Sequence, residues 1–135
     1  MTDFEFLKSE LQSGDFSCVV IKNGKKTTST LPSIKPLLAL LAEDENYLKN
    51  ADVADKVVGK AAALLLAYGK AAAVFGATMS SSAAEVLKQH NIPYACTNMV
   101  DFIENRTKTG MCPMEQLCLE IDDPAAAYAM LKAKV

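Results

Sequence analysis

Hydrophobic residues recur at helical spacing in residues 3–13 and then form a strand-like run at residues 16–21. The first pattern predicts a short helix that ends at Gly14, because glycine commonly follows the last helical residue. The second predicts a strand, and the Asn23-Gly24 pair that follows it is a strong hairpin signal. Residues 26–31 are therefore expected to return alongside that strand, as a polar strand whose threonines suit an edge position.

A short amphipathic helix is expected next, with Ser33 as its N-cap and prolines near its start. Its buried stripe consists of Leu37, Leu38, Leu40 and Leu41. A second, more hydrophobic helix is expected from about Asp52 or Asp55 to Tyr68, with the aspartates as its predicted caps. Because this helix is apolar on almost every side, we expect it to be buried in the core.

Two lysines and a glycine are conspicuous against this apolar background. Lys56 and Lys60 lie four residues apart, so they would share one face of the expected helix. Gly59 costs about 1 kcal/mol relative to alanine in a helix. It therefore suggests close approach of another part of the backbone, or of a ligand.

A strand–helix–strand unit follows. Residues 71–77 are typical of a buried strand, and residues 92–96 of a second short apolar strand. The helix between them starts with a capping box, Ser82-x-x-Glu85. Strands joined in this way run parallel with a right-handed crossover. Together with the N-terminal hairpin, this predicts a three-layer α/β/α sandwich with a mixed sheet. The chain is expected to form a single domain, residues 1–135, with helix 3–13 appended.

The C-terminal part carries the most distinctive stretch, residues 109–115. We expect a short helix at residues 100–105 before it, and a last helix capped by residues 122–124 after it. Within the stretch, Pro113 suits the first turn of a helix, which places Cys112 at the N-cap and Glu115 at the third helical position. Gly110 would permit a backbone conformation that other residues resist.

A thiol at a helix N-terminus favours the thiolate form, so Cys112 is a candidate nucleophile or covalent acceptor. The alternative is that Cys112 is a small buried hydrophobic residue. If the expected helix starts converge, Lys60 would stabilise the thiolate or an oxyanion, and Asp55 would orient a lysine or act as a base. The other candidate ligand-binding residues are Lys56, Gly59, Ser81, Arg106, Lys108, Gly110 and Glu115. Such a pocket would favour an anionic or nucleotide-like small molecule.

The composition limits the range of functions. The net charge is −2, and there is no basic run, so we expect no nucleic-acid binding. The longest apolar run is too short to span a bilayer, and the N-terminus lacks a signal-peptide pattern, so a cytoplasmic protein without membrane contact is expected. The four cysteines form no C-x-x-C pair, and we expect no metal and no cofactor. His90, the single histidine, reads as a surface or capping residue.

Two motifs, DKVVGKAAA at residues 55–63 and TGMCPME at residues 109–115, resemble the bacterial domain-of-unknown-function family numbered 1893. The resemblance covers roughly residues 17–121. It implies a cytidine deaminase-like fold, with no established biochemical function.

Zinc deaminases place His/Cys-x-Glu on one helix and Pro-Cys-x-x-Cys on the next. This chain has Gly59-Lys60-Ala61 at the first place and one thiol, Cys112, at the second. A catalytic zinc needs three protein ligands, so we predict neither zinc binding nor deamination by that mechanism.

Three functions stay open at this point. The first is a small-molecule site around Cys112 that either binds its ligand or acts on it. The second is a non-catalytic regulatory module that keeps a deaminase-like cleft. The third is a structural or partner-binding domain that uses the hairpin edge or the N-terminal helix, with a homodimer as one form of it.

Overall fold

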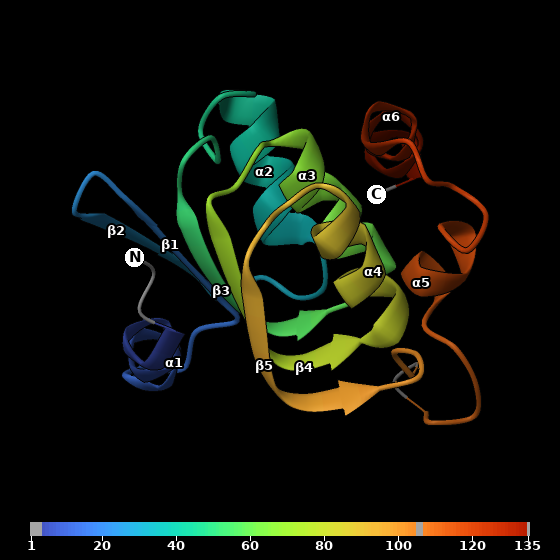
Figure 1. Ribbon diagram of the computed structural model, residues 1–135. Helices are drawn as coiled ribbons and strands as arrows, with labels where there is room; N and C mark the ends of the chain where they lie inside the picture. The colour runs from blue at the N-terminus through green and yellow to red at the C-terminus, as the bar shows by residue number, and fades with distance from the viewer. Residues whose placement is uncertain (1–3, 105–106, 135) are drawn as a thin grey trace.

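The computed structural model describes residues 4–104 and 107–134 (Figure 1). The helices are α1 (Phe4–Gln12), α2 (Lys35–Glu43), α3 (Lys60–Tyr68), α4 (Ser81–Gln89), α5 (Pro113–Leu117) and α6 (Pro124–Lys134). The strands are β1 (Cys18–Lys22), β2 (Lys25–Ser29), β3 (Asp52–Val58), β4 (Ala73–Ser80) and β5 (Tyr94–Val100). Across these ranges, no helix is long and apolar enough to cross a membrane.

The five strands form one mixed sheet in the order β2-β1-β3-β4-β5. Strand β1 runs antiparallel to both β2 and β3, whereas β3, β4 and β5 are parallel. The expected hairpin is confirmed, and both turn residues have positive φ, 52° at Asn23 and 77° at Gly24. This conformation suits the twist of the paired strands and explains the Asn-Gly sequence. The mixed sheet and the parallel β4–α4–β5 unit are also confirmed.

Helices cover both faces of the sheet (Figure 1). On one face α1 buries Leu7 and Leu11 against Val19, Ala54 and Phe75. Helix α1 is therefore a layer of the sandwich rather than an appendage. On the other face α3 lies at the centre and contacts α2, α4, α5 and α6. Its eight residues from Lys60 to Ala67 are all buried, as its apolar sequence predicts.

The predicted helix from Asp52 or Asp55 to Tyr68 is wrong in its first half. Residues 52–58 form β3, Gly59 is the N-cap, and only Lys60–Tyr68 is helical. The apolar residues of this strand, Val53, Ala54, Val57 and Val58, recur at helical spacing and lead directly into the apolar run of α3, so the pattern resembles that of one long helix. As a consequence, Lys56 and Lys60 share no helix face, and neither Asp52 nor Asp55 is a helix cap.

Three smaller predictions are also corrected. Residues 100–104 are not helical: Val100 ends β5, and Glu104 forms an isolated bridge with Met111, while Asn105 lies outside the described residues. The N-cap of α4 is Ser80 rather than Ser82, and its hydroxyl accepts from the Ala83 N–H at 3.2 Å. The N-cap of α2 is the residue after Ser33, and it makes no side-chain capping bond.

Candidate functional site

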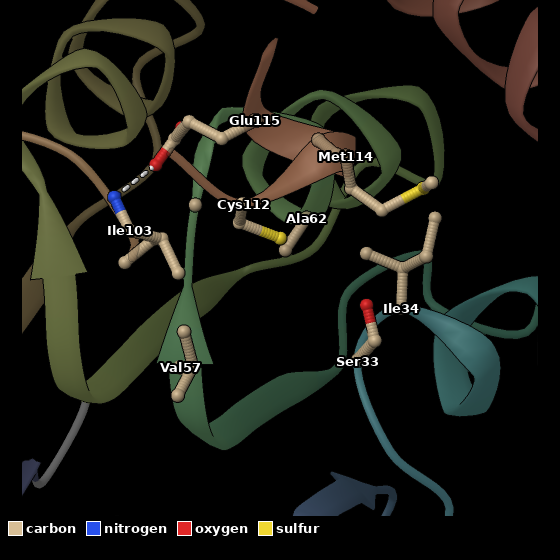
Figure 2. Close-up of a pocket in the computed structure, with 10 residues that line it drawn as sticks. Ser33, Ile34, Val57, Ala62, Ile103, Cys112, Met114 and Glu115 are labelled. Atoms are coloured by element: carbon tan, nitrogen blue, oxygen red, sulfur yellow. Dashed lines mark hydrogen bonds between the residues drawn. The ribbon is translucent and has the colours of Figure 1, made fainter. Parts of the chain in front are cut away.

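Cys112 lies at the mouth of a small hollow between α3, α5 and the start of α2 (Figure 2). The hollow has a volume of about 50 Å³. Its lining residues are Ser33, Ile34, Val57, Gly59, Ala61, Ala62, Ile103, Cys112, Met114 and Glu115. Most of these side chains are apolar, so the hollow suits a hydrophobic group of a ligand.

The N-cap position of Cys112 is confirmed, with Pro113 at the start of α5 and Glu115 in its first turn. The Cys112 N–H donates to the Ile103 carbonyl at 2.7 Å, but the thiol makes no capping bond. Figure 2 shows its sulfur directed toward Ala62. The side chain is half-buried, and no hydrogen bond joins the thiol to a base in the described ranges. The thiol therefore faces the hollow without an assigned partner.

A second, wider hollow adjoins the first. It has a volume of about 340 Å³ and is lined by Ser33, Ile34, Lys35, Met114 and Lys134. Three of these residues, Ser33, Ile34 and Met114, also line the first hollow. The two hollows together are called the Cys112 groove below. It combines an apolar, thiol-bearing end with a second end that is lined by two lysines, Lys35 and Lys134.

Glu115 lines the first hollow together with Cys112, and its side chain is only 2 % exposed. One carboxylate oxygen accepts from the Lys60 N–H, from Ser80 Oγ at 3.2 Å and from Ser82 Oγ at 3.3 Å. The other accepts from the Ile103 N–H at 2.7 Å. Figure 2 shows the carboxylate turned toward Ile103, away from the Cys112 sulfur.

The three helix starts that the sequence marked for an anionic ligand therefore do converge, but on Glu115. Lys60 begins α3, Ser80 caps α4, and Glu115 itself belongs to the first turn of α5. Helix N-termini present unpaired N–H groups and attract negative charge. Here the protein supplies that negative charge from its own chain, so these helix starts are already occupied.

The side chains of Lys60 and Cys112 do not face the same cavity. The Lys60 side chain is buried, and its ammonium group donates to the Leu119 carbonyl at 2.8 Å and to Asp122 at 3.1 Å. These contacts hold the segment between α5 and α6 against α3. Lys60 does not line either hollow of the groove, although its neighbours Gly59 and Ala61 line the first.

Asp55 lies in β3 directly opposite Cys18 of β1, away from the groove. It is 4 % exposed; one oxygen accepts from the Val57 N–H at 3.3 Å. The other oxygen has no hydrogen-bond partner in the described residues. Burial raises the pKa of Asp55 to about 8, against a smaller opposing effect of backbone N–H groups. Burial and the nearby Asp55 charge likewise raise the pKa of the Cys18 thiol.

Four other predicted ligand-binding residues do not line the groove: Lys56, Ser81, Lys108 and Gly110. Lys56 is an exposed strand residue 3.6 Å from Asp15, and the Ser81 hydroxyl donates to the Asp101 carbonyl at 3.3 Å. Gly110 does not adopt a positive φ, so the predicted special backbone conformation is wrong there. Lys108 is exposed and has a φ of 57°. Arg106 lies outside the described residues.

Comparison with known proteins identifies the family. The profile of the family described as "Domain of unknown function (DUF1893)", TM1506, matches residues 6–135. The chain belongs to the DUF1893 family. Its structure is similar to the crystal structure of the DUF1893 family protein TM1506 from Thermotoga maritima, with a TM-score of 0.89 and 27 % identity. That similarity covers 100 % of this chain and 93 % of the other. No curated protein matches the chain.

Sequence reasoning missed several groove residues of this DUF1893 protein, above all Lys35, Lys134 and Ile34. The predicted start of α2 is nearly correct, but no local pattern indicates that this start lies beside α5 and the end of α6. One signal is visible only in the structure: Ser33 has a φ of 59°, which is uncommon for a residue other than glycine. Within the described ranges, no group of three or more His, Cys, Asp or Glu residues could hold a metal ion.

Gly59 explains why the start of α3 can approach Glu115 so closely. A Cβ atom at this position would lie 3.0 Å from Ile103 Cγ1 and 3.2 Å from both carboxylate oxygens of Glu115. The predicted close approach is therefore real, but to a side chain of the protein itself. We expect Gly59→Ala to lower the free energy of unfolding by about 1–3 kcal/mol, because the carboxylate must shift. Urea denaturation measures this change.

Gly110→Ala is the matched control for Gly59→Ala. No atom lies within 4 Å of a Cβ at Gly110, and its φ is not positive. We expect the free energy of unfolding of this variant to lie within about 0.5 kcal/mol of the wild-type value, as for ordinary surface substitutions. Equal stabilities of the two variants would show that the packing around Gly59 tolerates a methyl group.

Proposed function

We propose that this DUF1893 protein binds a small molecule that combines an apolar body with an anionic head, and that the Cys112 groove is its binding site. One observation carries the proposal: the apolar hollow at Cys112 and the lysine-bearing hollow share Ser33, Ile34 and Met114. Ligand pockets are typically apolar with a few polar groups that fix orientation. Lys35 and Lys134 would supply that orientation through their charge.

The thiol of Cys112 would contact the apolar end of the ligand. A cysteine nucleophile is ordinarily activated by an adjacent base within about 3 Å, or by a lowered pKa. The two groups considered for that role, Lys60 and Asp55, contact other partners. Binding therefore explains the arrangement with fewer assumptions than catalysis, and it matches the alternative of a non-catalytic module with a retained cleft.

The probe for this proposal is 8-anilinonaphthalene-1-sulfonate, which joins an aromatic body to an anionic group. We expect saturable fluorescence enhancement on titration into the native protein. Replacing both Lys35 and Lys134 by glutamine should raise the Kd about tenfold, equivalent to about 1.4 kcal/mol. Alkylation of Cys112 with iodoacetamide should block the hollow and abolish saturable binding.

The control exchanges two lysines outside the groove, Lys25 and Lys49, for glutamine, which makes the same change in net charge. Equal affinities of the two double variants would contradict the proposal, because the dye would then respond to net charge alone. The alkylation rate also tests the catalytic alternative. If Cys112 reacts at pH 7 many times faster than glutathione, a thiolate nucleophile becomes the better assignment.

We also infer that the fold is a variant of the cytidine deaminase-like fold. The inference is supported by the mixed sheet with helices on both faces and by the adjacent N-termini of α3 and α5, which correspond to the two motifs of that resemblance. The four free cysteines fit a reducing compartment, and on that ground we place the protein in the cytoplasm.

A further inference from the structure

We infer that a second copy of this chain pairs with edge strand β5, in an antiparallel arrangement that joins the two sheets into one. The two edges of the sheet, β2 and β5, lie on opposite sides of the molecule (Figure 1). They differ in sequence: β2 carries Lys25 and Lys26, whereas the seven residues of β5, YACTNMV, include no charge and no proline. Charges and prolines are the usual protection of an edge against pairing.

Alternate residues of β5 direct their backbone N–H and C=O groups to the outer edge of the sheet, where a partner strand could bond to them. The Val74 N–H donates to the Pro93 carbonyl at 3.0 Å, so Pro93 and alternate residues after it point toward β4. The residues between them therefore direct their N–H and C=O groups to the outer edge: Tyr94, Cys96, Asn98 and Val100. In the part of the chain that the structure describes, β5 pairs with β4 and with no other strand.

Of the self-complementary registers that these outward residues allow, the one centred on Thr97 pairs all seven residues of β5. Around a two-fold axis at Thr97, Tyr94 lies opposite Val100 of the copy, and Cys96 lies opposite Asn98. Both are pairs of outward-directed residues, so each pair can exchange two hydrogen bonds. Met99 then lies opposite Ala95 of the copy, on the same face of the joined sheet.

The side chains around β5 favour a copy of the same chain as the occupant. Met99 is 50 % exposed and Phe102 is 39 % exposed, so both leave apolar surface for a partner to cover. Exposed Lys88 precedes the strand, and exposed Asp101 and Glu104 follow it. In an antiparallel pair the start of one strand approaches the end of the other, which brings opposite charges together at both ends.

The test is cross-linking at the proposed two-fold axis. In a background with Cys96→Ser and Cys112→Ser, Thr97→Cys would place two sulfurs on directly opposed residues, whose Cα atoms lie about 4.5 Å apart in such a pair. That spacing is within the range of a disulfide. We expect the purified variant to form a disulfide-linked dimer under mild oxidation, detected by mass and by non-reducing electrophoresis. Thr28→Cys, an exposed position on edge strand β2, is the matched control and should stay monomeric.

A second measurement does not depend on disulfide chemistry. Sedimentation velocity of the wild type should show a concentration-dependent dimer, weak because a single strand pair buries a small area. Met99→Lys should raise the dimer Kd more than about tenfold by placing charge on the edge, whereas Thr28→Lys should leave it unchanged. A monomeric wild type at high concentration, equal cross-linking of the two cysteine variants, or a dimer insensitive to Met99→Lys would each overturn the inference.

Discussion

We expect Asp55→Asn to stabilise the protein at alkaline pH, by about 2–4 kcal/mol at pH 9. Asp55 is buried, one of its oxygens lacks a partner in the described residues, and its pKa is raised to about 8 by burial. The folded protein therefore holds this carboxyl neutral at pH 7. Above pH 8 it must carry a buried, unpaired charge. Asparagine occupies nearly the same volume and never acquires that charge.

The sign of the pH dependence follows from the two pKa values. In the unfolded chain Asp55 titrates near its ordinary value of about 3.9. Between about pH 4 and pH 8 the folded state thus binds a proton that the unfolded state lacks. The contribution of Asp55 to stability is complete below pH 4 and falls by up to about 1.4 kcal/mol per pH unit until pH 8. The total loss of wild-type stability is on the order of 5 kcal/mol. The gain from Asp55→Asn is smaller than this, because the asparagine amide group is itself buried unpaired.

Urea denaturation of wild type and Asp55→Asn from pH 5 to pH 9 measures the effect. The two proteins should have similar stabilities at pH 5 and diverge steadily toward pH 8. Asp15→Asn is the control, because its contact with Lys56 is exposed and should contribute less than about 0.5 kcal/mol. Parallel pH profiles for wild type and Asp55→Asn would mean that the Asp55 carboxylate is ionised and solvated throughout this range.

Local chemistry along the chain predicted several details of the site correctly. The Asn23-Gly24 turn and the placement of Cys112 and Glu115 at the start of α5 depend on neighbouring residues. The β4–α4–β5 unit pairs residues far apart in the chain, and the order strand–helix–strand predicted it. The hydrophobic pattern also identified α3 as the centre of the core. The turn and the helix start are decided by sterics and hydrogen bonds within a few residues, whereas the parallel unit and the buried helix follow from hydrophobic patterns over longer stretches.

What the sequence did not reveal depends on long-range contacts. Residues 52–58 could be read as a helix because their apolar residues do not alternate with polar ones, but recur as adjacent pairs four residues apart. Once β3 is a strand, Asp55 belongs to the sheet and Lys56 to its surface. The direction of the Lys60 side chain depends on the segment after α5, which no local pattern places. The Cys112 groove likewise needs α2, α5 and α6 to meet, and only tertiary packing decides that.

The second large effect is expected at Glu115, which we predict to be the most sensitive polar residue of the fold. Its carboxylate accepts hydrogen bonds from the backbone of α3, from two serines at the start of α4 and from Ile103. Glu115→Gln keeps the size but replaces one acceptor oxygen by an NH₂ group that faces donors. We expect the free energy of unfolding to fall by about 2–4 kcal/mol, because buried N–H groups then lose their acceptor.

Glu85→Gln, on the exposed side of α4, makes the same chemical change and should cost less than about 0.5 kcal/mol. Hydrogen exchange separates a local from a general effect. The amides of Lys60 and Ile103 should lose protection in Glu115→Gln by more than the global destabilisation, because they lose their direct acceptor. Equal stabilities of the two variants would mean that water replaces the carboxylate. The helix starts would then be accessible to an external anion after all, and the Cys112 groove would have to be extended to include them.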